Sequence, residues 1–443
     1  MSNRLDQNIT AASVLKFTLP SIVMMVVMSL YTVVDGTFVS RLVGTDAFSA
    51  VNIVYPLLSV TIGLGTMFGT GMTAIVSRKL GEGKRKEANQ ILSFITLSAI
   101  LLGVVLSGVC LVFLEDIIYL MGANEAIYGE CYAYLFPLVF FFVPNILQLM
   151  FQSLYVADGK PHIGLVTTIL GGLTNVVLDY VFIAWFHMGI AGAAVATGLG
   201  YSIPALYGLY YFSCNTRGNF RFARPKADFR VLAHAASNGS SEMVNYLSSS
   251  VTTFLFNVIM MRLVGQDGVA AVSILLYLDF VLVAICLGYS MGAAPLISFN
   301  YGRMDQEKLK KLFCISVGFC IVVSAVMTAG TILFSNPLSA IFTSRGTSVY
   351  ELAAAGLKIY AISYLFKGFN IFASAMFTAF GDGRTSAVLS FMRTLVFLVV
   401  LLIGLSALFG VTGVWWAPVL AEVLAFVLAA GAVVKYRKTY HYA

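Results

Sequence analysis

Apolar residues along this chain come in long runs, without the polar stripe of a surface helix. Windows of about 20 apolar residues recur from Val14 to Lys435, and a helix of about 20 residues spans the hydrocarbon core of a bilayer. A helix also satisfies its own backbone hydrogen bonds in lipid, whereas these runs are too long and too uniformly apolar for barrel strands. The pattern predicts an all-α polytopic membrane protein with twelve transmembrane helices. The expected spans cover residues 14–40, 46–77, 87–113, 128–156, 161–186, 190–213, 232–263, 268–298, 306–333, 348–379, 384–409 and 411–435.

The second half of the chain repeats the first. RLVGTDAFSAV at 41–51 returns 221 residues later as RLVGQDGVAAV at 262–272. Each half contains an even number of spans, so both halves cross the membrane in the same sense, as parallel repeats do. We therefore expect two six-helix lobes related by a pseudo-two-fold axis along the membrane normal. The expected lobes are 1–213 and 232–443, joined by a cytoplasmic linker at 214–231.

Composition and charge support a membrane location and an orientation. The chain is 59% hydrophobic and 11% charged, against roughly a quarter charged in soluble domains. Its net charge of +7 comes from Lys and Arg in alternate loops, such as 78–86 and 217–230, whereas 115–130 holds four acids and no base. The positive-inside rule places both termini in the cytoplasm. The basic excess suits lipid headgroups and does not indicate nucleic-acid binding.

No catalytic motif is visible. The four histidines lack metal-ligand spacing, the six cysteines form no CxxC pair, and the chain has no Walker loop or GxGxxG. The sequence predicts a protein that is not an enzyme and holds no cofactor. Two lobes that rock around a central cavity are the usual architecture of a secondary transporter.

Polar residues break the repeat in the first half. Asp35 lies inside span one, where the second half has Phe256, and Asp179 lies inside span five, opposite an apolar stretch. An aspartate in the bilayer costs about 2.5–3.5 kcal/mol. Asn175 shares a helix face with Asp179, and Asp35, Asp179 and Thr197 fall roughly 9–10 Å below the outer surface. These four residues form a candidate H⁺ or Na⁺ site. The alternative is that each acid separately caps the backbone or pairs with a buried arginine.

The second half has charges of its own, and their counterparts in the first half are uncharged. Interhelical ion pairing and cavity lining are both open for this set, which comprises Glu242, Asp279, Lys367, Arg393 and Glu422. A polar stripe on span four has the spacing i, i+3 and i+7. Contacts between helices and contact with substrate are both open for this stripe, formed by Asn145, Gln148 and Gln152.

The whole chain resembles the multidrug and toxic compound extrusion (MATE) family, in its DinF-like bacterial branch. The resemblance is carried by VDGTFVSRLVG after span one, NVVLDYVF in span five, and the pair GIAGAAVAT and GVTGVWWAP. It implies that the protein exports drugs or organic cations through the plasma (inner) membrane of a bacterium. Entry of H⁺ or Na⁺ would drive the export. We expect the transporter to be a monomer.

The resemblance also implies roles for particular residues. The first-lobe cation site of that branch uses an Asp on helix one, an Asn and an Asp on helix five, and a Thr on helix six. These fall on Asp35, Asn175, Asp179 and Thr197, while Glu242 resembles the helix-seven acid of the other branch. The alternative function is that of a lipid-linked precursor flippase of the wider superfamily.

Overall fold

The computed structural model describes residues 4–38, 43, 45–214 and 218–442, and these residues form helices and short connections with no strand. A short 3₁₀ turn, η1 (Arg4–Asp6), precedes the first long helix. The helices of the first half are α1 (Ala11–Phe38), α2 (Thr45–Gly81), α3 (Arg85–Val112), α4 (Leu114–Leu120), α5 (Glu125–Val139), α6 (Phe142–Ala157), α7 (Pro161–Asp179), the π-helical η3 (Tyr180–Trp185) and α8 (Gly189–Cys214).

The second half continues in the same manner, with two short helices, α4 and α12, at corresponding places in the two halves. Its helices are α9 (Phe229–Leu263), α10 (Gln266–Gly302), α11 (Gln306–Leu333), α12 (Ser335–Phe342), α13 (Ser348–Tyr360), the 3₁₀ turn η4 (Ala361–Ser363), α14 (Tyr364–Phe380), α15 (Gly383–Phe391), the π-helical η5 (Met392–Phe397) and α16 (Leu398–Tyr440).

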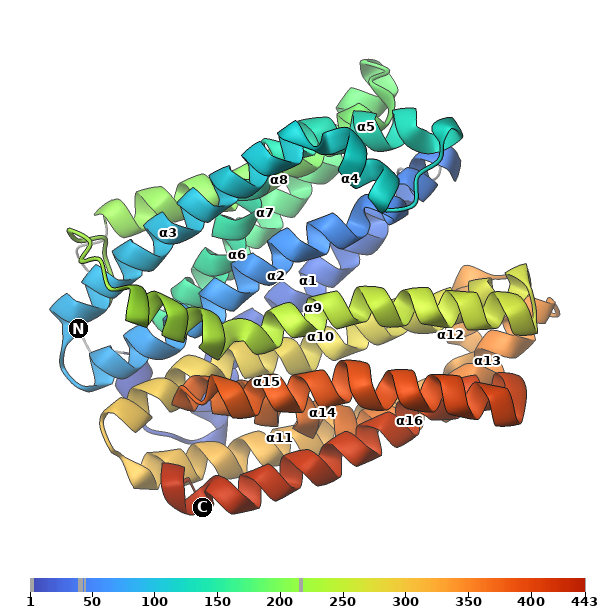
Figure 1. Cartoon of the computed structure of the whole chain (residues 1–443). Coiled ribbons are helices and arrows are strands. Elements are labelled where there is room, and N and C mark those ends of the chain that lie inside the picture. The colour runs from blue at the N-terminus through green and yellow to red at the C-terminus, as the bar shows by residue number, and fades with distance from the viewer. Residues whose placement is uncertain (1–3, 39–42, 44, 215–217, 443) are drawn as a thin grey trace.

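These helices make the twelve spans that the hydropathy pattern predicts, although one span has an unexpected shape and the last two form one continuous helical run. The span expected at 128–156 consists of α5 and α6, which are bent by 59° shortly after Pro137. The continuous run Gly383–Tyr440 has 58 residues, or about 87 Å of helix, far more than a bilayer needs. It turns back at Gly410, whose φ of 58° is unfavourable for residues with a Cβ, and so forms two antiparallel spans (Figure 1).

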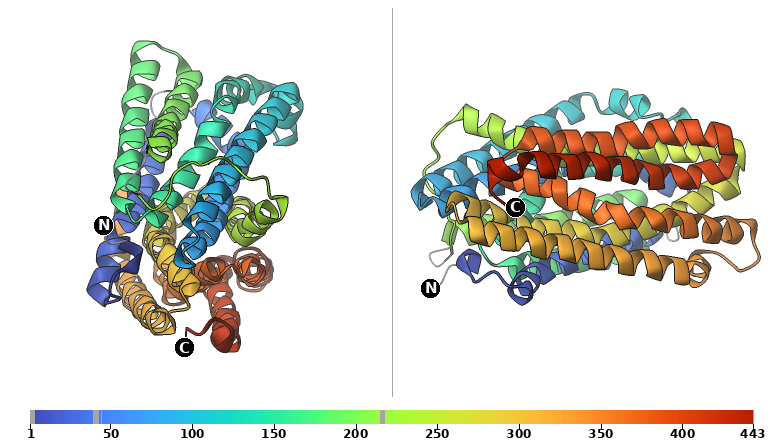
Figure 2. Two further views of the ribbon diagram at one scale, coloured as in Figure 1. Left: turned by 90° about the vertical axis from the view of Figure 1, so that its left-hand side faces the viewer. Right: turned by 90° about the horizontal axis from the view of Figure 1, so that it is seen from below.

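The spans form two lobes, α1–α8 and α9–α16, which diverge toward the end that carries α4, α5, α12 and α13 (Figure 1). They lie close together at the other end, where both termini are found. Across the lobe boundary α2 packs along α9 and α1 packs along α10. Figure 2 (left) looks onto the end with the termini and shows one lobe above the other. The lobe limits 1–213 and 232–443 stay a prediction, and α9 begins inside the expected linker, at Phe229.

Equivalent glycines of the repeat lie at this boundary. A Cβ added to Gly71 of α2 would lie 2.0 Å from the carbonyl oxygen of Ala235 on α9. The residue 221 positions later, Gly292 of α10, faces Thr18 of α1, where a Cβ would lie 2.8 Å from the threonine Cγ2. The two halves therefore use the same repeat position to bring the backbones of opposite lobes together, as small residues do between membrane helices.

Gly71→Val is expected to lower the stability of the protein by about 1–3 kcal/mol, because the new side chain overlaps a backbone that cannot rotate away. Thermal unfolding in detergent measures the effect. Gly108→Val is the matched control, because Gly108 also lies within a helix and a Cβ there meets nothing within 4 Å. Equal loss in the two variants would show that the close contact does not matter.

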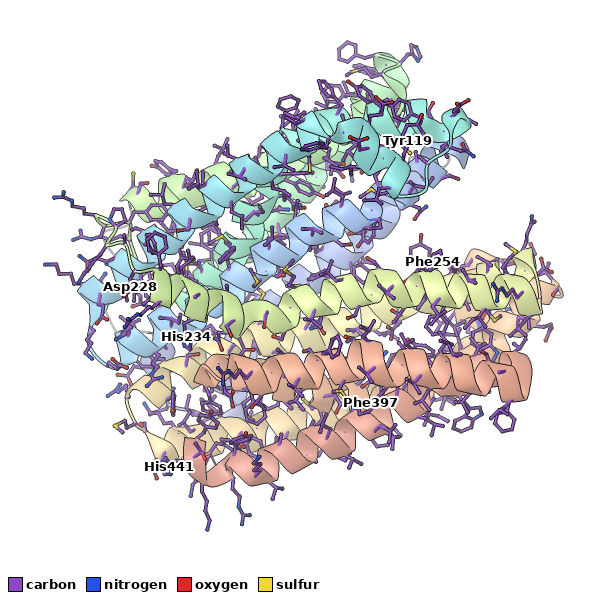
Figure 3. All side chains as sticks on the ribbon, in the orientation of Figure 1. Tyr119, Asp228, His234, Phe254, Phe397 and His441 are labelled. Atoms are coloured by element: carbon purple, nitrogen blue, oxygen red, sulfur yellow. The ribbon has the colours of Figure 1, made fainter. Side chains whose placement is uncertain are left out.

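The end with the termini is also the basic end, because α2 ends there with Arg78 and Lys79 and α16 with Arg437 and Lys438. Figure 3 shows the labelled Asp228, His234 and His441 toward this end and Tyr119 toward the opposite end. The carboxylate of Asp6 pairs there with Arg303 and Lys308, which ties the segment before α1 to the loop after α10. Partial burial acts to raise the pKa of the Asp6 carboxyl, but the hydrogen bonds and charges of the two bases outweigh burial and hold it below its usual value.

Candidate functional site

A cavity of about 370 Å³ lies between the two lobes. Helices α1, α2 and α6 of the first lobe line it with mainly small or apolar side chains, such as Met25 and Thr66, and with the polar Gln152. The second lobe contributes the charged lining from α9, α10, α14, η5 and α16. All five second-lobe charges noted in the sequence face this cavity, namely Glu242, Asp279, Lys367, Arg393 and Glu422. Three acids and two bases therefore meet in one place.

Lys367 and Asp279 form the shorter of two ion pairs in the cavity wall. The Nζ of Lys367 on α14 donates to Oδ1 of Asp279 on α10 at 2.7 Å and to the Tyr360 hydroxyl at 3.3 Å. The same Nζ lies 4.9 Å from the ring centroid of Tyr360 and 5.3 Å from that of Tyr364. The ammonium is thus held by one carboxylate and two aromatic faces, and the Lys367 side chain is only 9% exposed.

Arg393 and Glu422 form the second pair, which is looser. Arg393 Nη1 lies 3.3 Å from Oε1 of Glu422, while the other carboxylate oxygen accepts a 2.7 Å hydrogen bond from Asn370 Nδ2. The buried Nε of Arg393 has no hydrogen-bond partner among the described residues. Four of the five second-lobe charges therefore form ion pairs, and all five also line the cavity.

Glu242 of α9 differs from the other two acids. It lines the cavity, but no basic side chain in the described part of the chain lies within 4.0 Å of its carboxylate. With two acids paired to two bases, Glu242 gives the cavity wall one acid more than it has bases.

The polar set of the first lobe lies on α7 and α8, apart from this cavity lining. Asn175 Nδ2 donates to Thr197 Oγ1 at 3.2 Å, and Asn175, Asp179 and Thr197 are 2%, 0% and 4% exposed. The buried Oδ1 of Asn175 has no hydrogen-bond partner among the described residues and is available as a cation ligand. Asp179 ends α7 at the point where the helix widens into η3. Asp35 belongs to α1, but its side chain lies outside the described residues.

The polar stripe on α6 is divided between two roles. Asn145 Nδ2 donates to Thr61 of α2, and Gln148 Nε2 donates to Asn145. Neither is part of the cavity lining. Asn145 joins α6 to α2, whereas the Gln148 hydrogen bond stays within α6. Gln152 lines the cavity and donates to Thr168 of α7.

Three residues that contact the ion pairs were not predicted from the sequence, namely Tyr360, Tyr364 and Asn370. Tyr360, Tyr364 and Lys367 are spaced i, i+4 and i+7, so they lie on one helical face despite the η4 turn between α13 and α14. That spacing was a usable signal. Apolar stretches containing tyrosine are common in membrane spans, however, and only the position of Asp279 shows what these rings surround.

Twelve spans in two lobes around a charged cavity define a membrane transporter, not an enzyme. The MatE family model matches residues 20–181 and 243–403, and the chain belongs to this family, as its resemblance to MATE proteins predicted.

Individual relatives match over nearly the whole chain. The multidrug export protein MepA of Staphylococcus aureus is 26% identical over 420 residues, which cover 93% of this chain and 91% of MepA. A multidrug resistance MATE family transporter of the MOP superfamily, solved in an outward-facing conformation, matches with a TM-score of 0.91 at 22% identity and covers 98% of each chain. The Vibrio cholerae MATE transporter VcmN, solved as a mutant, matches with a TM-score of 0.90 at 20% identity over 98% of each chain. These two structural matches show a shared fold.

Proposed function

We propose that this protein is a secondary active multidrug antiporter that exports organic cations and drugs in exchange for H⁺ or Na⁺. The observation that carries the proposal is the cavity between the lobes, whose wall holds one acid more than it holds bases. The relatives named as multidrug exporters support it, because their similarity covers more than nine tenths of this chain.

Substrate and coupling ion have separate places in this proposal. The substrate occupies the cavity, where Glu242 attracts its positive charge. The ion occupies the site of Asp35, Asn175, Asp179 and Thr197. The three whose side chains the structure describes, Asn175, Asp179 and Thr197, are not among the cavity-lining residues. Coupling then acts through the helices that connect the sites, since the ion favours one arrangement of the lobes and the substrate the other. The ion gradient contributes about 2.3 kcal/mol for each charge moved across 100 mV.

The flippase alternative is less well supported by the cavity. A lipid-linked precursor carries phosphate groups, and phosphate favours unpaired Arg or Lys. Lys367 and Arg393 are the bases in the cavity wall, and each already pairs with an acid.

Transport in proteoliposomes tests the proposal. Ethidium serves as the cationic probe, and pH and sodium gradients are imposed separately in vesicles of the same lipid with and without protein. We expect one of the two gradients to drive ethidium movement against its own gradient, which also identifies the coupling ion. Passive ethidium leakage under both gradients would overturn the antiporter assignment.

We also propose that the protein lies in a bacterial plasma membrane with its basic end in the cytoplasm. Single cysteines at Lys84 and Lys226 should then react only with reagent on the cytoplasmic side, and a cysteine at Glu125 only with reagent outside. The exposed native Cys214 and Cys314 are first replaced by serine. Labelling of Lys84→Cys and Glu125→Cys from the same side would refute the proposed topology.

A further inference from the structure

The ammonium group of Lys367 has surroundings that would suit the ammonium group of a ligand. A carboxylate of Asp279 at 2.7 Å supplies the opposite charge, and the rings of Tyr360 and Tyr364 supply two faces within 5.3 Å. Proteins commonly recognise organic ammonium groups with aromatic faces. Arg393 contrasts with this arrangement, because its described partner is Glu422 and no described aromatic ring lies over its guanidinium.

We propose that Asp279, Tyr360 and Tyr364 form a binding subsite for the ammonium group of a substrate, and that Lys367 fills this subsite while no substrate is bound. The inference rests on the proposed function, because it assigns the cavity to cationic substrates. It adds that Lys367 occupies the place of the substrate at Asp279, whereas Glu242 has no basic side chain within 4.0 Å among the described residues.

The subsite is within reach of a ligand in the cavity. Asp279, Tyr360 and Lys367 all belong to its lining, and the Asp279 side chain remains 20% exposed while it is paired. A ligand can therefore approach the carboxylate from the cavity without first opening the protein core.

Lys367 can leave the subsite without losing every acidic partner. Its side chain is a flexible four-carbon stem, and the carboxylate of Glu422, which also lines the cavity, interacts electrostatically with it. Displacement by a substrate therefore exchanges one acidic neighbour for another. A lysine with Asp279 as its sole acidic neighbour would oppose the exchange far more strongly.

Benzylammonium binding to the purified full-length protein in detergent tests the inference, with benzyl alcohol as the uncharged comparison. Lys367→Met removes the competitor and should bind benzylammonium about tenfold more tightly than the wild type, because the fraction of free subsites rises. Asp279→Asn with Lys367→Met removes both charges and should bind it more weakly than the wild type. Benzyl alcohol should bind all three proteins alike.

If the Lys367–Asp279 ion pair only stabilises the fold, the variants should have a different order of benzylammonium affinity. The uncharged double variant would then bind benzylammonium as the wild type does, and that result would overturn the inference. Lys358→Met is the matched control, because Lys358 is an exposed lysine of α13 outside the cavity lining, and its affinity should not change. Glu242→Gln combined with Lys367→Met should still bind more tightly than Glu242→Gln alone.

Two further outcomes are informative. If Lys367→Met accumulates poorly, purification in benzylammonium should restore folded protein, since the ligand replaces the missing cation, and absence of any recovery counts against the subsite. If the wild type moves ethidium under an ion gradient but Lys367→Met binds benzylammonium no more tightly, the subsite is wrong and the transport function stands. If the wild type moves no ethidium, the proposed function itself fails.

Discussion

Asp179→Asn is expected to reduce gradient-driven transport at least about a hundredfold, equivalent to about 2.8 kcal/mol, while the protein remains folded. The asparagine keeps the size of the side chain but can neither carry a proton nor neutralise a sodium ion. Asp179 is fully buried on α7, one helical turn after Asn175, whose amide donates to Thr197. The proposed assignment of Asp35 to the same site predicts the same loss for Asp35→Asn.

Substrate binding should respond differently from transport. Asp179 is not among the cavity-lining residues, so ethidium affinity in detergent should stay within about threefold of the wild type. Asp116→Asn, in an exposed acid of α4, controls for loss of a carboxylate and should transport normally. Wild-type transport by Asp179→Asn would remove this residue from the coupling site. Loss of ethidium binding together with transport would place Asp179 at the substrate instead.

The membrane spans could be predicted from the sequence because burial in lipid depends mainly on length and apolarity. Bends in the spans could not be predicted in this way. The segment 128–156 is apolar on both sides of Pro137, so its hydropathy is the same whether it is straight or bent by 59°. Proline is the usual cause of a kink, but its presence in membrane helices does not fix the angle. Pro20 and Pro56 lie inside helices that continue past them.

The candidate sites were only partly predictable for a related reason. The repeat singled out Asn175 and Asp179 because a duplicated scaffold makes unmatched polar residues visible, and α7 and α8 do bring Asn175 against Thr197. The pairing of Lys367 with Asp279, 88 positions away in sequence, depends on how α10 packs against α14. The sequence indicates that buried charges need partners of opposite charge, but it does not identify which residues pair. The aromatic residues around Lys367 carry no charge, so the search for unmatched charges in the repeat did not identify them.

Breaking the Arg393–Glu422 pair is the second change with a large expected effect. Glu422→Gln should destabilise the protein by about 3–5 kcal/mol, because a buried guanidinium loses its carboxylate. Its Nε already lacks a hydrogen-bond partner among the described residues. Arg393→Met should cost less than Glu422→Gln, because Asn370 continues to donate to the Glu422 carboxylate at 2.7 Å. Thermal unfolding in detergent at one lipid content measures both variants.

The double variant Arg393→Met with Glu422→Gln separates a structural pair from a substrate site. Desolvation of an unpaired charge causes most of the loss in each single variant, so removing both charges should recover more than half of the stability lost in Glu422→Gln. Glu242 interacts electrostatically with Arg393, and Glu242→Gln therefore serves as the control: no ion pair within 4.0 Å is broken, so it should change stability by less than Glu422→Gln. Additive losses in the double variant would mean that Arg393 and Glu422 stabilise the protein independently, and the 3.3 Å contact between them would then contribute nothing to the fold.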